Sequence, residues 1–330
     1  MIKSNTKPKV VIIGGGTGSF VALTGLKKYP VDLTAIVSMM DSGGSSGRLR
    51  DELGVLPPGD VRQCLVALST SSKLLRELFM YRFEEGDMKG HNFGNIFLSS
   101  LEKTTGSMEK AIREVGKILR IHGQVVPVTF EKADLCVDLM DGKTIIGETH
   151  IDEVEKKVNR AKIKRAFLKP EISANSNALK EIENADFIII GPGDLYTSII
   201  PNLLVNGVIK SLKRSRAQKI YVMNLMTKYG QTTHYTARDH ILDLEQYLGK
   251  GTIDTILINT KHPSKETLSW YEDFDEQAVQ DNISGLNYYV LRKDLLKNTI
   301  LKKSPTDSLK RSIIRHDSAK LASAIMEIID

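Results

Sequence analysis

The first stretch with a clear chemical signature is Gly14–Gly18, which reads Gly-Gly-Gly-Thr-Gly. It follows the apolar run Val10–Ile13, which is typical of a strand buried on both faces of a parallel sheet, and it precedes an expected helix at Phe20–Lys27. Glycines at such a turn let the backbone approach a phosphate, and the N-terminus of the following helix offers N–H donors to an anion. We therefore predict that a phosphate-bearing ligand binds on this turn.

The turn departs from the usual dinucleotide-binding fingerprint. That fingerprint needs a third glycine where this chain has Ser19, and it needs an acidic residue at the end of the second strand. The expected second strand, Leu33–Val37, runs instead into Ser38. A generic phosphate site is therefore favoured over a standard NAD site, and a purely structural turn stays open as the alternative.

Other apolar segments that we expect to be strands also end in glycine or small polar residues, at Asp41, Gly191, Asn224 and Asn259. The carboxyl ends of parallel strands lie along one edge of a sheet, where ligands bind. We therefore expect these loops to converge with the turn at Gly14 on a single site. The alternative interpretation is that they are ordinary surface turns.

Charged residues in these loops have expected roles. Arg48 is placed to bind a phosphate through two hydrogen bonds, and Arg62 is a second candidate for that role. Asp60 is expected to cap the following helix, with Gln63 as its capping-box partner. His91 offers a polar group before another helix, although a single histidine is more often structural.

Rival catalytic motifs fit less well. The segment Gly43–Gly47 reads Gly-Gly-Ser-Ser-Gly and matches the hydrolase G-x-S-x-G pattern, but its serine lies several residues beyond the strand, whereas a nucleophile elbow joins strand and helix directly. The sequence contains no zinc-protease, paired-cysteine or Walker A motif, so we predict no catalytic residue and no dedicated metal site. At most, Asp41, Asp60 or Asp194 would hold Mg²⁺ against ligand phosphates.

The order of the expected elements predicts an α/β fold, with a Rossmann-like, mostly parallel sheet flanked by helices in a single domain spanning residues 1–330. Residues from about 60 to 122 look wholly helical, which suggests a helical insertion. Residues from about 125 to 168 look β-rich, and the pair Asp141-Gly142 indicates a hairpin there. The strands expected outside this region are Val10–Ile13, Leu33–Val37, Asp186–Ile190, Lys219–Met223, Thr252–Ile258 and Gly285–Leu291.

Composition narrows the classes of function. Of the 330 residues, 41% are hydrophobic and 26% are charged, which is ordinary for a globular protein. The polar N-terminus lacks a signal-peptide core and no apolar run approaches about 18 residues, so we expect a cytoplasmic protein with no membrane insertion.

Two distant cysteines, Cys64 and Cys136, agree with a reducing compartment. The net charge of +6 suits phosphate binding, and no recognisable module accompanies the basic run Lys156–Lys169, so we expect no nucleic-acid partner.

Together and in this order, these motifs resemble the gluconeogenesis-factor family (YvcK-like proteins), whose relatives include the CofD-like 2-phospho-L-lactate transferases. The matching segments span almost the whole chain and are Ile13–Gly18, Asp41–Arg48, Pro57–Arg62, His91–Asn95, Gly191–Pro201, Asn224–Thr227 and Arg315–Lys320. The resemblance implies a Rossmann-like fold, a cytoplasmic bacterial setting and binding of UDP-sugars such as UDP-N-acetylglucosamine. It also implies a role in carbon-source use, cell-wall integrity and cell shape, with no reaction firmly attached to this branch.

The resemblance also implies roles for single residues. Arg315 resembles a ligand-contacting arginine of the family, and Tyr271 matches an aromatic ligand contact in a weaker alignment. Ser318 follows Arg-His-Asp, where the family can carry a phosphorylatable threonine, so a Ser/Thr kinase is one expected partner and a second copy of the chain is another. Departures at Asp194 and in Thr227–Gln231 leave the fine ligand preference open. The candidate ligand-binding residues are therefore Gly14, Gly15, Gly16, Thr17, Gly18, Asp41, Ser42, Gly43, Gly44, Ser45, Arg48, Asp60, Arg62, His91, Asn92, Asn95, Gly191, Pro192, Gly193, Asp194, Leu195, Asn224, Thr227, Tyr271 and Arg315.

The competing hypothesis is a Mg²⁺-dependent transferase that acts on a nucleotide-diphosphate-linked donor, as the phospholactate transferases do. That branch typically carries an acidic pair after its second strand, of the Asn-Thr-Gly-Asp-Asp kind, whereas this chain has the single Asp41 there. We therefore favour a nucleotide-sugar-binding regulatory protein that requires no cofactor. Oxidoreductase chemistry is the least favoured.

Overall fold

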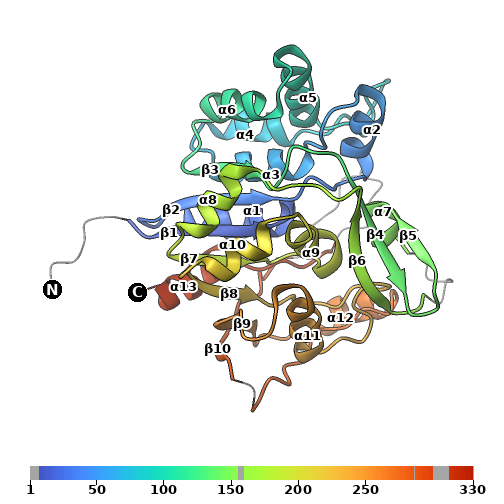
Figure 1. The fold of residues 1–330 in the computed structure, drawn as a ribbon, viewed down its shortest axis with the longest axis vertical. Helices are drawn as coiled ribbons and strands as arrows, with labels where there is room; N and C mark the ends of the chain where they lie inside the picture. The colour runs from blue at the N-terminus through green and yellow to red at the C-terminus, as the bar shows by residue number, and fades with distance from the viewer. Residues whose placement is uncertain (1–6, 155–159, 286, 300–311, 330) are drawn as a thin grey trace.

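A seven-stranded parallel sheet forms the centre of the protein (Figure 1). The computed structural model describes residues 7–154, 160–285, 287–299 and 312–329. The strands lie in the order β10-β9-β8-β7-β1-β2-β3, and every neighbouring pair is parallel, which confirms the predicted Rossmann-like α/β class. Their bounds are β1 Lys9–Gly14, β2 Asp32–Val37, β3 Gln124–Pro127, β7 Phe187–Ile190, β8 Gln218–Val222, β9 Thr255–Asn259 and β10 Tyr289–Lys293.

Strand β1 is buried on both faces, as its unbroken apolar run predicted. Successive side chains of a strand point to opposite faces, so Val11 and Ile13 belong to one apolar core while Val10 and Ile12 belong to the other. In register, Val10 lies beside Leu33 of β2. The N-terminal apolar stretch therefore joins the two halves of the hydrophobic interior.

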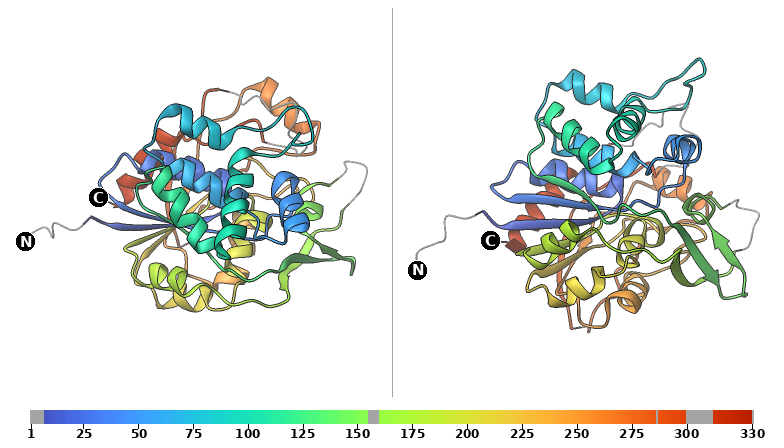
Figure 2. Two further views of the ribbon diagram at one scale, coloured as in Figure 1. Left: turned by 90° about the horizontal axis from the view of Figure 1, so that it is seen from above. Right: turned by 45° about the horizontal axis from the view of Figure 1, so that its top comes forward.

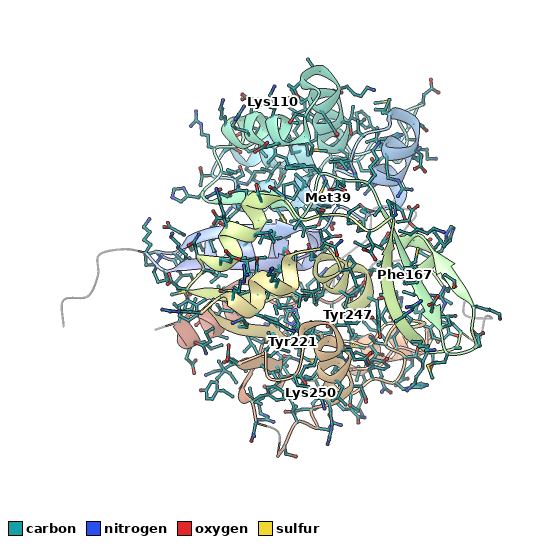
Figure 3. The ribbon with its side chains drawn as sticks, viewed as in Figure 1. Met39, Lys110, Phe167, Tyr221, Tyr247 and Lys250 are labelled. Carbon is teal, nitrogen blue, oxygen red and sulfur yellow. The ribbon has the colours of Figure 1, made fainter. Side chains whose placement is uncertain are left out.

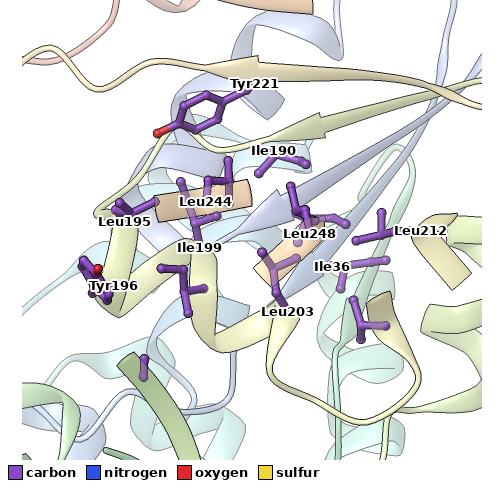
Figure 4. Close-up of a cluster of buried hydrophobic side chains, with 14 of the residues drawn as sticks. Ile36, Ile190, Leu195, Tyr196, Ile199, Leu203, Leu212, Tyr221, Leu244 and Leu248 are labelled. Atoms are coloured by element: carbon purple, nitrogen blue, oxygen red, sulfur yellow. The ribbon is translucent and has the colours of Figure 1, made fainter. Parts of the chain in front are cut away.

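Helices cover both faces of the sheet (Figures 1 and 2). One core takes side chains from α1 (Gly16–Leu26), α3 (Gly59–Leu68), α5 (Phe93–Thr105), α6 (Met108–Ile118) and α13 (Ser318–Ile329). The other core takes side chains from α8 (Ser176–Glu183), α9 (Ile200–Leu203), α10 (Val208–Arg214) and α11 (Ala237–Leu248), and part of it is drawn in Figure 4. Within the described residues, we find no helix with the length and apolar character needed to cross a membrane.

The chain between β2 and β3 is helical over a longer stretch than predicted. Besides the expected helices α3, α4 (Lys73–Met80), α5 and α6, it contains α2 (Gly44–Leu53), which was expected to be a loop. The prediction failed because α2 is rich in glycine and serine and lacks an apolar stripe. Where the helical insertion begins stays a prediction, although α3 itself packs in the core against the sheet.

The predicted cap of α3 was wrong. The helix begins at Gly59 after Pro58, and no side chain caps it. Asp60 therefore lies in the first turn instead of at the N-cap. Its carboxylate lies beside the glycine turn after β1, since a Cβ on Gly16 would lie 2.5 Å from Asp60 Oδ1.

A second, antiparallel sheet has the order β5-β4-β6 and lies beyond the carboxyl ends of the main strands (Figure 1). Its strands are β4 (Asp134–Leu139), β5 (Thr144–Ile146) and β6 (Ile163–Lys169), and the predicted hairpin at Asp141-Gly142 joins the first two. Tyr247 of α11 lies next to β6 (Figure 3), and its hydroxyl accepts the N–H of Ala166 at 2.8 Å.

Two details of the region predicted to be β-rich differ from the sequence expectation. Its first strand pairs with β2 as the edge strand β3 of the main sheet. Its hairpin ends at Ile146, and the chain then turns at Gly147 into the short helix α7 (Glu148–Asp152), which the β-rich prediction did not include. Within the basic run, the first lysines, at 156 and 157, lie outside the described residues, while Lys164, Arg165 and Lys169 are exposed on β6.

Candidate functional site

Loops from four neighbouring strands converge on one polar cavity of about 220 Å³ at the carboxyl edge of the sheet. The loops follow β1, β2, β7 and β8, and they are joined by α7, by α12 (Lys265–Glu272) and by the segment around Arg315. The predicted convergence of the bends at Gly14, Asp41 and Gly191 is confirmed. The sequence-predicted residues that line the cavity are Gly16, Thr17, Gly18, Asp41, Gly43, Ser45, Asp60, Arg62, Asn95, Pro192, Gly193, Asp194, Asn224, Thr227, Tyr271 and Arg315.

Some predicted site residues lie beside the cavity without lining it. Gly14 and Gly191 are behind it, where a Cβ on Gly14 would lie 3.9 Å from the Cα of Gly191. The side chain of Asn259 is used locally, because it bonds to the backbone of Lys261 and of Leu295. The others that do not line the cavity are Gly15, Ser42, Gly44, Arg48, His91, Asn92 and Leu195.

The structure does not support the phosphate-binding role predicted for Arg48. Arg48 is exposed on the outer side of α2, and its guanidinium donates to the carbonyl of Lys89 at 3.1 Å. Along α2 the residues Ser45, Ser46, Gly47 and Leu49 are buried while Arg48 is exposed, and its guanidinium is used by the Lys89 carbonyl outside the cavity.

His91 and Asn92 support the site from behind. The Nδ1 atom of His91 lies 3.3 Å from the hydroxyl of Ser45, and burial together with nearby Arg48 lowers the pKa of His91. Asn92 caps α5 by accepting the N–H of Asn95, and it donates to the carbonyl of Met80. These two residues hold Ser45 and Asn95 in place at the cavity wall.

The turn after β1 is in close contact with the turn after β7. A Cβ on Gly18 would lie 1.7 Å from the carbonyl oxygen of Pro192, so only glycine fits there. On the same turn, the hydroxyl of Thr17 donates to Gln63 Oε1 at 3.1 Å. Gly191 and Gly193, which flank Pro192, have φ of 82° and 159°, a region that favours glycine.

Helices α1, α2 and α3, which begin at the cavity, lack side-chain caps, whereas α5, whose first turn also reaches the cavity, and the more distant α6 and α11 have them. The N-cap residues of α1, α2 and α3 are Gly15, Gly43 and Pro58, and none makes a capping hydrogen bond. The N-termini of α5, α6 and α11 are capped by the side chains of Asn92, Ser107 and Thr236. The unpaired N–H groups of an uncapped helix are available to an anion, and the helix dipole favours a negative charge there.

A group of carboxylates lines the cavity near these helix ends. Glu148 of α7 accepts the N–H of Ser42 at 3.4 Å. Burial raises the pKa of Glu148 well above its usual value, and the charges of Asp41, Asp152 and Asp60 raise it further. No local pattern in the sequence pointed to Glu148 or Asp152, because the small sheet brings them to the cavity through a long-range contact.

Lys228, in the loop after β8, lies among carboxylates. Its ammonium is 3.2 Å from Asp152 Oδ1, and Gln231 donates to the same carboxylate at 2.8 Å. Burial by itself would lower the pKa of Lys228, but the charges of Asp152, Asp194 and Glu276 outweigh it and the pKa is raised. Burial also raises the pKa of Asp194, and Lys228 partly opposes that shift.

Near the loop after β8, the almost fully buried Tyr271 reaches the cavity wall. The phenol of Tyr271 lies 2.5 Å from the hydroxyl of Ser312 and accepts the N–H of Ile314 at 3.2 Å. Leu225 and Arg315 line the cavity next to it. Among the residues that the structure describes, no group of three or more His, Cys, Asp or Glu side chains is arranged to hold a metal ion.

Comparisons with known proteins agree on one family. The family model described as 2-phospho-L-lactate transferase CofD matches residues 10–296. The gluconeogenesis factor of Bacillus subtilis is 42% identical over 325 residues, covering 98% of each chain, and a Thermotoga maritima relative is 44% identical over 321 residues, covering 97% of this chain and 99% of its own. A crystal structure of a UPF0052-family protein from Bacillus halodurans superposes with a TM-score of 0.88 at 38% identity, covering 98% of this chain and 100% of that chain.

Proposed function

The chain belongs to the gluconeogenesis-factor family, within the wider CofD family, and from that premise we propose that its cavity binds a nucleotide-diphosphate sugar such as UDP-N-acetylglucosamine. We further propose that binding regulates gluconeogenic carbon use, cell-wall integrity and cell shape in the cytoplasm, without turnover of the ligand. The proposal requires no cofactor.

One observation carries the ligand proposal: the contact between the turns at Gly18 and Pro192, directly in front of the uncapped N-terminus of α1. There the backbone comes close to the cavity and its N–H groups are available, which is what a diphosphate needs. Arg315 and Lys228 add positive charge nearby, and the almost fully buried Tyr271 reaches the cavity wall. This combination suits a ligand that carries a diphosphate.

Thermal unfolding with a panel of UDP-sugars, GDP and NAD(P) tests the proposal. A ligand that binds the folded state stabilises it by RT ln(1 + [L]/Kd), which is about 2.7 kcal/mol at a concentration 100 times Kd. We expect stabilisation by UDP-sugars, and we expect Arg315→Ala to reduce it. Stabilisation by NAD alone, with none by UDP-sugars, would contradict the proposal.

A Mg²⁺-dependent phospholactate-type transferase is the second candidate. The specific observation in its favour is that Asp41, Asp60 and Glu148 lie near one another in the cavity, although the sequence showed only one acid in the loop after β2. These side chains do not form a three-ligand metal site among the described residues, so Mg²⁺ would need ligand phosphates as further ligands. Formation of a phospholactyl product in the presence of Mg²⁺ would favour this candidate.

Two partner predictions stay open to test. Ser318 is the first residue of α13, where a phosphate would interact favourably with the helix dipole, and we keep it as a proposed kinase site. Mass spectrometry of the protein from growing cells tests that proposal. Analytical ultracentrifugation tests the proposed homodimer.

A further inference from the structure

The structure contains a second cavity, of about 470 Å³, at the β3 edge of the main sheet. It lies between α6, β3 and the start of α8, and Figure 1 shows the two helices on either side of β3. Among the described residues, none lines both this cavity and the one at the strand ends. A volume of this size is typical of pockets that hold small organic molecules, so the second cavity is a separate candidate site.

Helix α6 turns one face toward this cavity. The lining residues of that face are Glu109, Ile112, Arg113, Gly116, Lys117 and, just after the helix, Arg120. They recur every three to four positions, which places them on one side of a helix. With three basic residues and one acidic residue, the face complements an anion. Arg113 and Lys117 lie 3.8 and 2.8 Å from Glu114, so Arg120 is the cation that remains for a ligand.

The inner end of the cavity is apolar. Ile112 and Val125 belong to one hydrophobic core and Val126 belongs to the other, and all three are buried, so they contact the cavity at its inner end. The partly buried Phe130 lines the cavity beside them. An apolar inner end below a basic wall suits a molecule that has an apolar body and one anionic group.

Arg120 occupies a position where glycine is usual. Helix α6 ends in a Schellman motif, in which the N–H of Ile121 donates to the Gly116 carbonyl at 3.0 Å and the N–H of Arg120 to the Lys117 carbonyl at 3.1 Å. Arg120 has a φ of 49°, in the left-handed region that is unfavourable for a residue with a side chain. Within the described part of the chain, its exposed guanidinium has no hydrogen-bond or ion-pair partner. Glycine would suit the backbone better, whereas arginine leaves a cation available at the cavity.

The free edge of β3 does not suit an added strand. The N–H of Val128 donates to Val37 of β2, and peptide groups alternate between the two sides of a parallel strand, so Val125 and Pro127 face away from β2. Pro127 has no N–H, and its carbonyl already accepts the side-chain amide of Asn175 at 3.2 Å. Within β3, Val125 alone offers both backbone groups to the cavity. An extended peptide therefore could not continue the ladder here, and a small ligand is favoured.

We infer that the second cavity binds an amphipathic organic anion, with its apolar chain along Ile112 and Phe130 and its anionic group at Arg120. This site is independent of the proposed nucleotide-sugar site, since the two share no described lining residue. The ligand would gain apolar burial at the inner end and a charge-assisted hydrogen bond at the rim.

Calorimetric titration of the whole chain with octanoate, acetate and octanol tests the inference, because acetate lacks the apolar chain and octanol lacks the charge. Octanoate should bind at one site, and acetate should bind at least about tenfold more weakly because it buries far fewer methylene groups. Octanol should bind about three- to tenfold more weakly than octanoate, the effect of one lost charged contact. Saturating UDP-N-acetylglucosamine should leave octanoate binding unchanged.

Substitutions at Arg120 locate the anionic group. Arg120→Gly should weaken octanoate binding by about three- to tenfold and should not lower the unfolding temperature of the free protein, because glycine adopts the positive φ without strain. Arg120→Lys keeps the charge and should retain most of the binding. The matched control is Arg238→Ala on α11, an exposed arginine that lines neither cavity and should leave octanoate binding unchanged.

The inference is wrong if octanoate does not bind, if acetate or octanol binds as tightly, or if Arg120→Gly binds octanoate as the unmodified chain does. Competition between octanoate and UDP-N-acetylglucosamine would place octanoate in the first cavity and would also overturn it. If octanoate does not bind and Arg120→Gly instead changes self-association in analytical ultracentrifugation, a second copy of the chain covers this cavity. Failure of UDP-N-acetylglucosamine to bind would count against the proposed function alone.

Discussion

The ammonium of Lys228 lies 3.2 Å from Asp152 Oδ1, and this ion pair links the loop after β8 to helix α7 across the cavity. The side chains of the pair are 17% and 16% exposed, so solvent screens them little. Because α7 is also tied to Ser42 after β2, through the N–H of Thr149 at 3.0 Å, it bridges two loops on opposite sides of the glycine turns.

Lys228→Met should lower the free energy of unfolding by about 2–3 kcal/mol, because it removes the ammonium paired with Asp152 and close to Asp194 and Glu276 in a mostly buried place. Urea denaturation at neutral pH measures the change. The matched control is Lys73→Met, which removes an 84% exposed lysine paired with Glu77 at 3.6 Å and should change stability by less than about 0.5 kcal/mol. Equal losses in both variants would contradict a structural role for the bridge.

Gly18→Ala should destabilise the protein by about 3 kcal/mol or more and abolish ligand binding, because its Cβ would overlap the backbone carbonyl of Pro192. Gly116→Ala in α6 is the control, since its Cβ would meet only the terminal methyl of Ile121, at 3.1 Å, and alanine favours the helix. Thermal unfolding and calorimetric titration report both effects. Wild-type behaviour of Gly18→Ala would mean that the two turns are not in contact.

His316 should make stability depend on pH. Burial lowers its pKa to about 4, with Arg315 adding to the shift and a hydrogen bond to the Met223 backbone opposing it. The unfolded chain therefore binds a proton at His316 near pH 6.5, whereas the folded protein binds it only near pH 4. The contribution of His316 to the free energy of unfolding thus falls by about 3 kcal/mol in all as pH drops from about 6.5 to 4. His316→Asn should make the urea-denaturation midpoint depend less on pH over this range, whereas His122→Asn, at an exposed position, should leave that dependence unchanged. An unchanged pH dependence in His316→Asn would contradict the assignment.

Glu148→Gln should stabilise the protein at neutral pH. The folded-state pKa of Glu148 is raised, first by burial and then by Asp41 and Asp152, so its contribution is present in acid and is lost as pH rises through that value. Removing the charge should therefore give a stability gain that grows as pH rises above the usual glutamate pKa of about 4.5. The exposed Glu85→Gln should show no such growth. A loss of stability in Glu148→Gln would show that the ionised carboxylate is favoured by a partner.

The parts of the fold that depend on local patterns were predictable. The apolar runs of β1 and β7 mark strands buried on both faces without reference to other parts of the chain. The glycines at the turn after β1 allow close approach of the backbone, which is also a local property. The order of loops along one edge follows from the parallel arrangement. This is why 16 of the 25 candidate residues line the cavity, and why the others lie close behind it or, as with Arg48, on the outer face of a helix.

Long-range contacts could not be predicted. Glu148 and Asp152 reach the cavity only because the small sheet folds back over it, and nothing in their local sequence marks them. Helix α2 was missed because it contains Gly47, and glycine is a poor helix former. The glycine is required by a long-range feature of the fold, since a Cβ added there would lie 2.0 Å from the carbonyl oxygen of Ser42. Asp60 was expected to cap its own helix, but its carboxylate lies instead beside the turn at Gly16.

A crystal structure of the chain with UDP-N-acetylglucosamine tests the central claim most directly. We predict a diphosphate at the N–H groups of Gly16–Gly18, next to Gly193 and Arg315, between the ends of β1 and β7. A ligand bound elsewhere would contradict the account, for example in the second cavity, which lies between α6 and the edge strand β3 and is lined by Ile112 and Phe130.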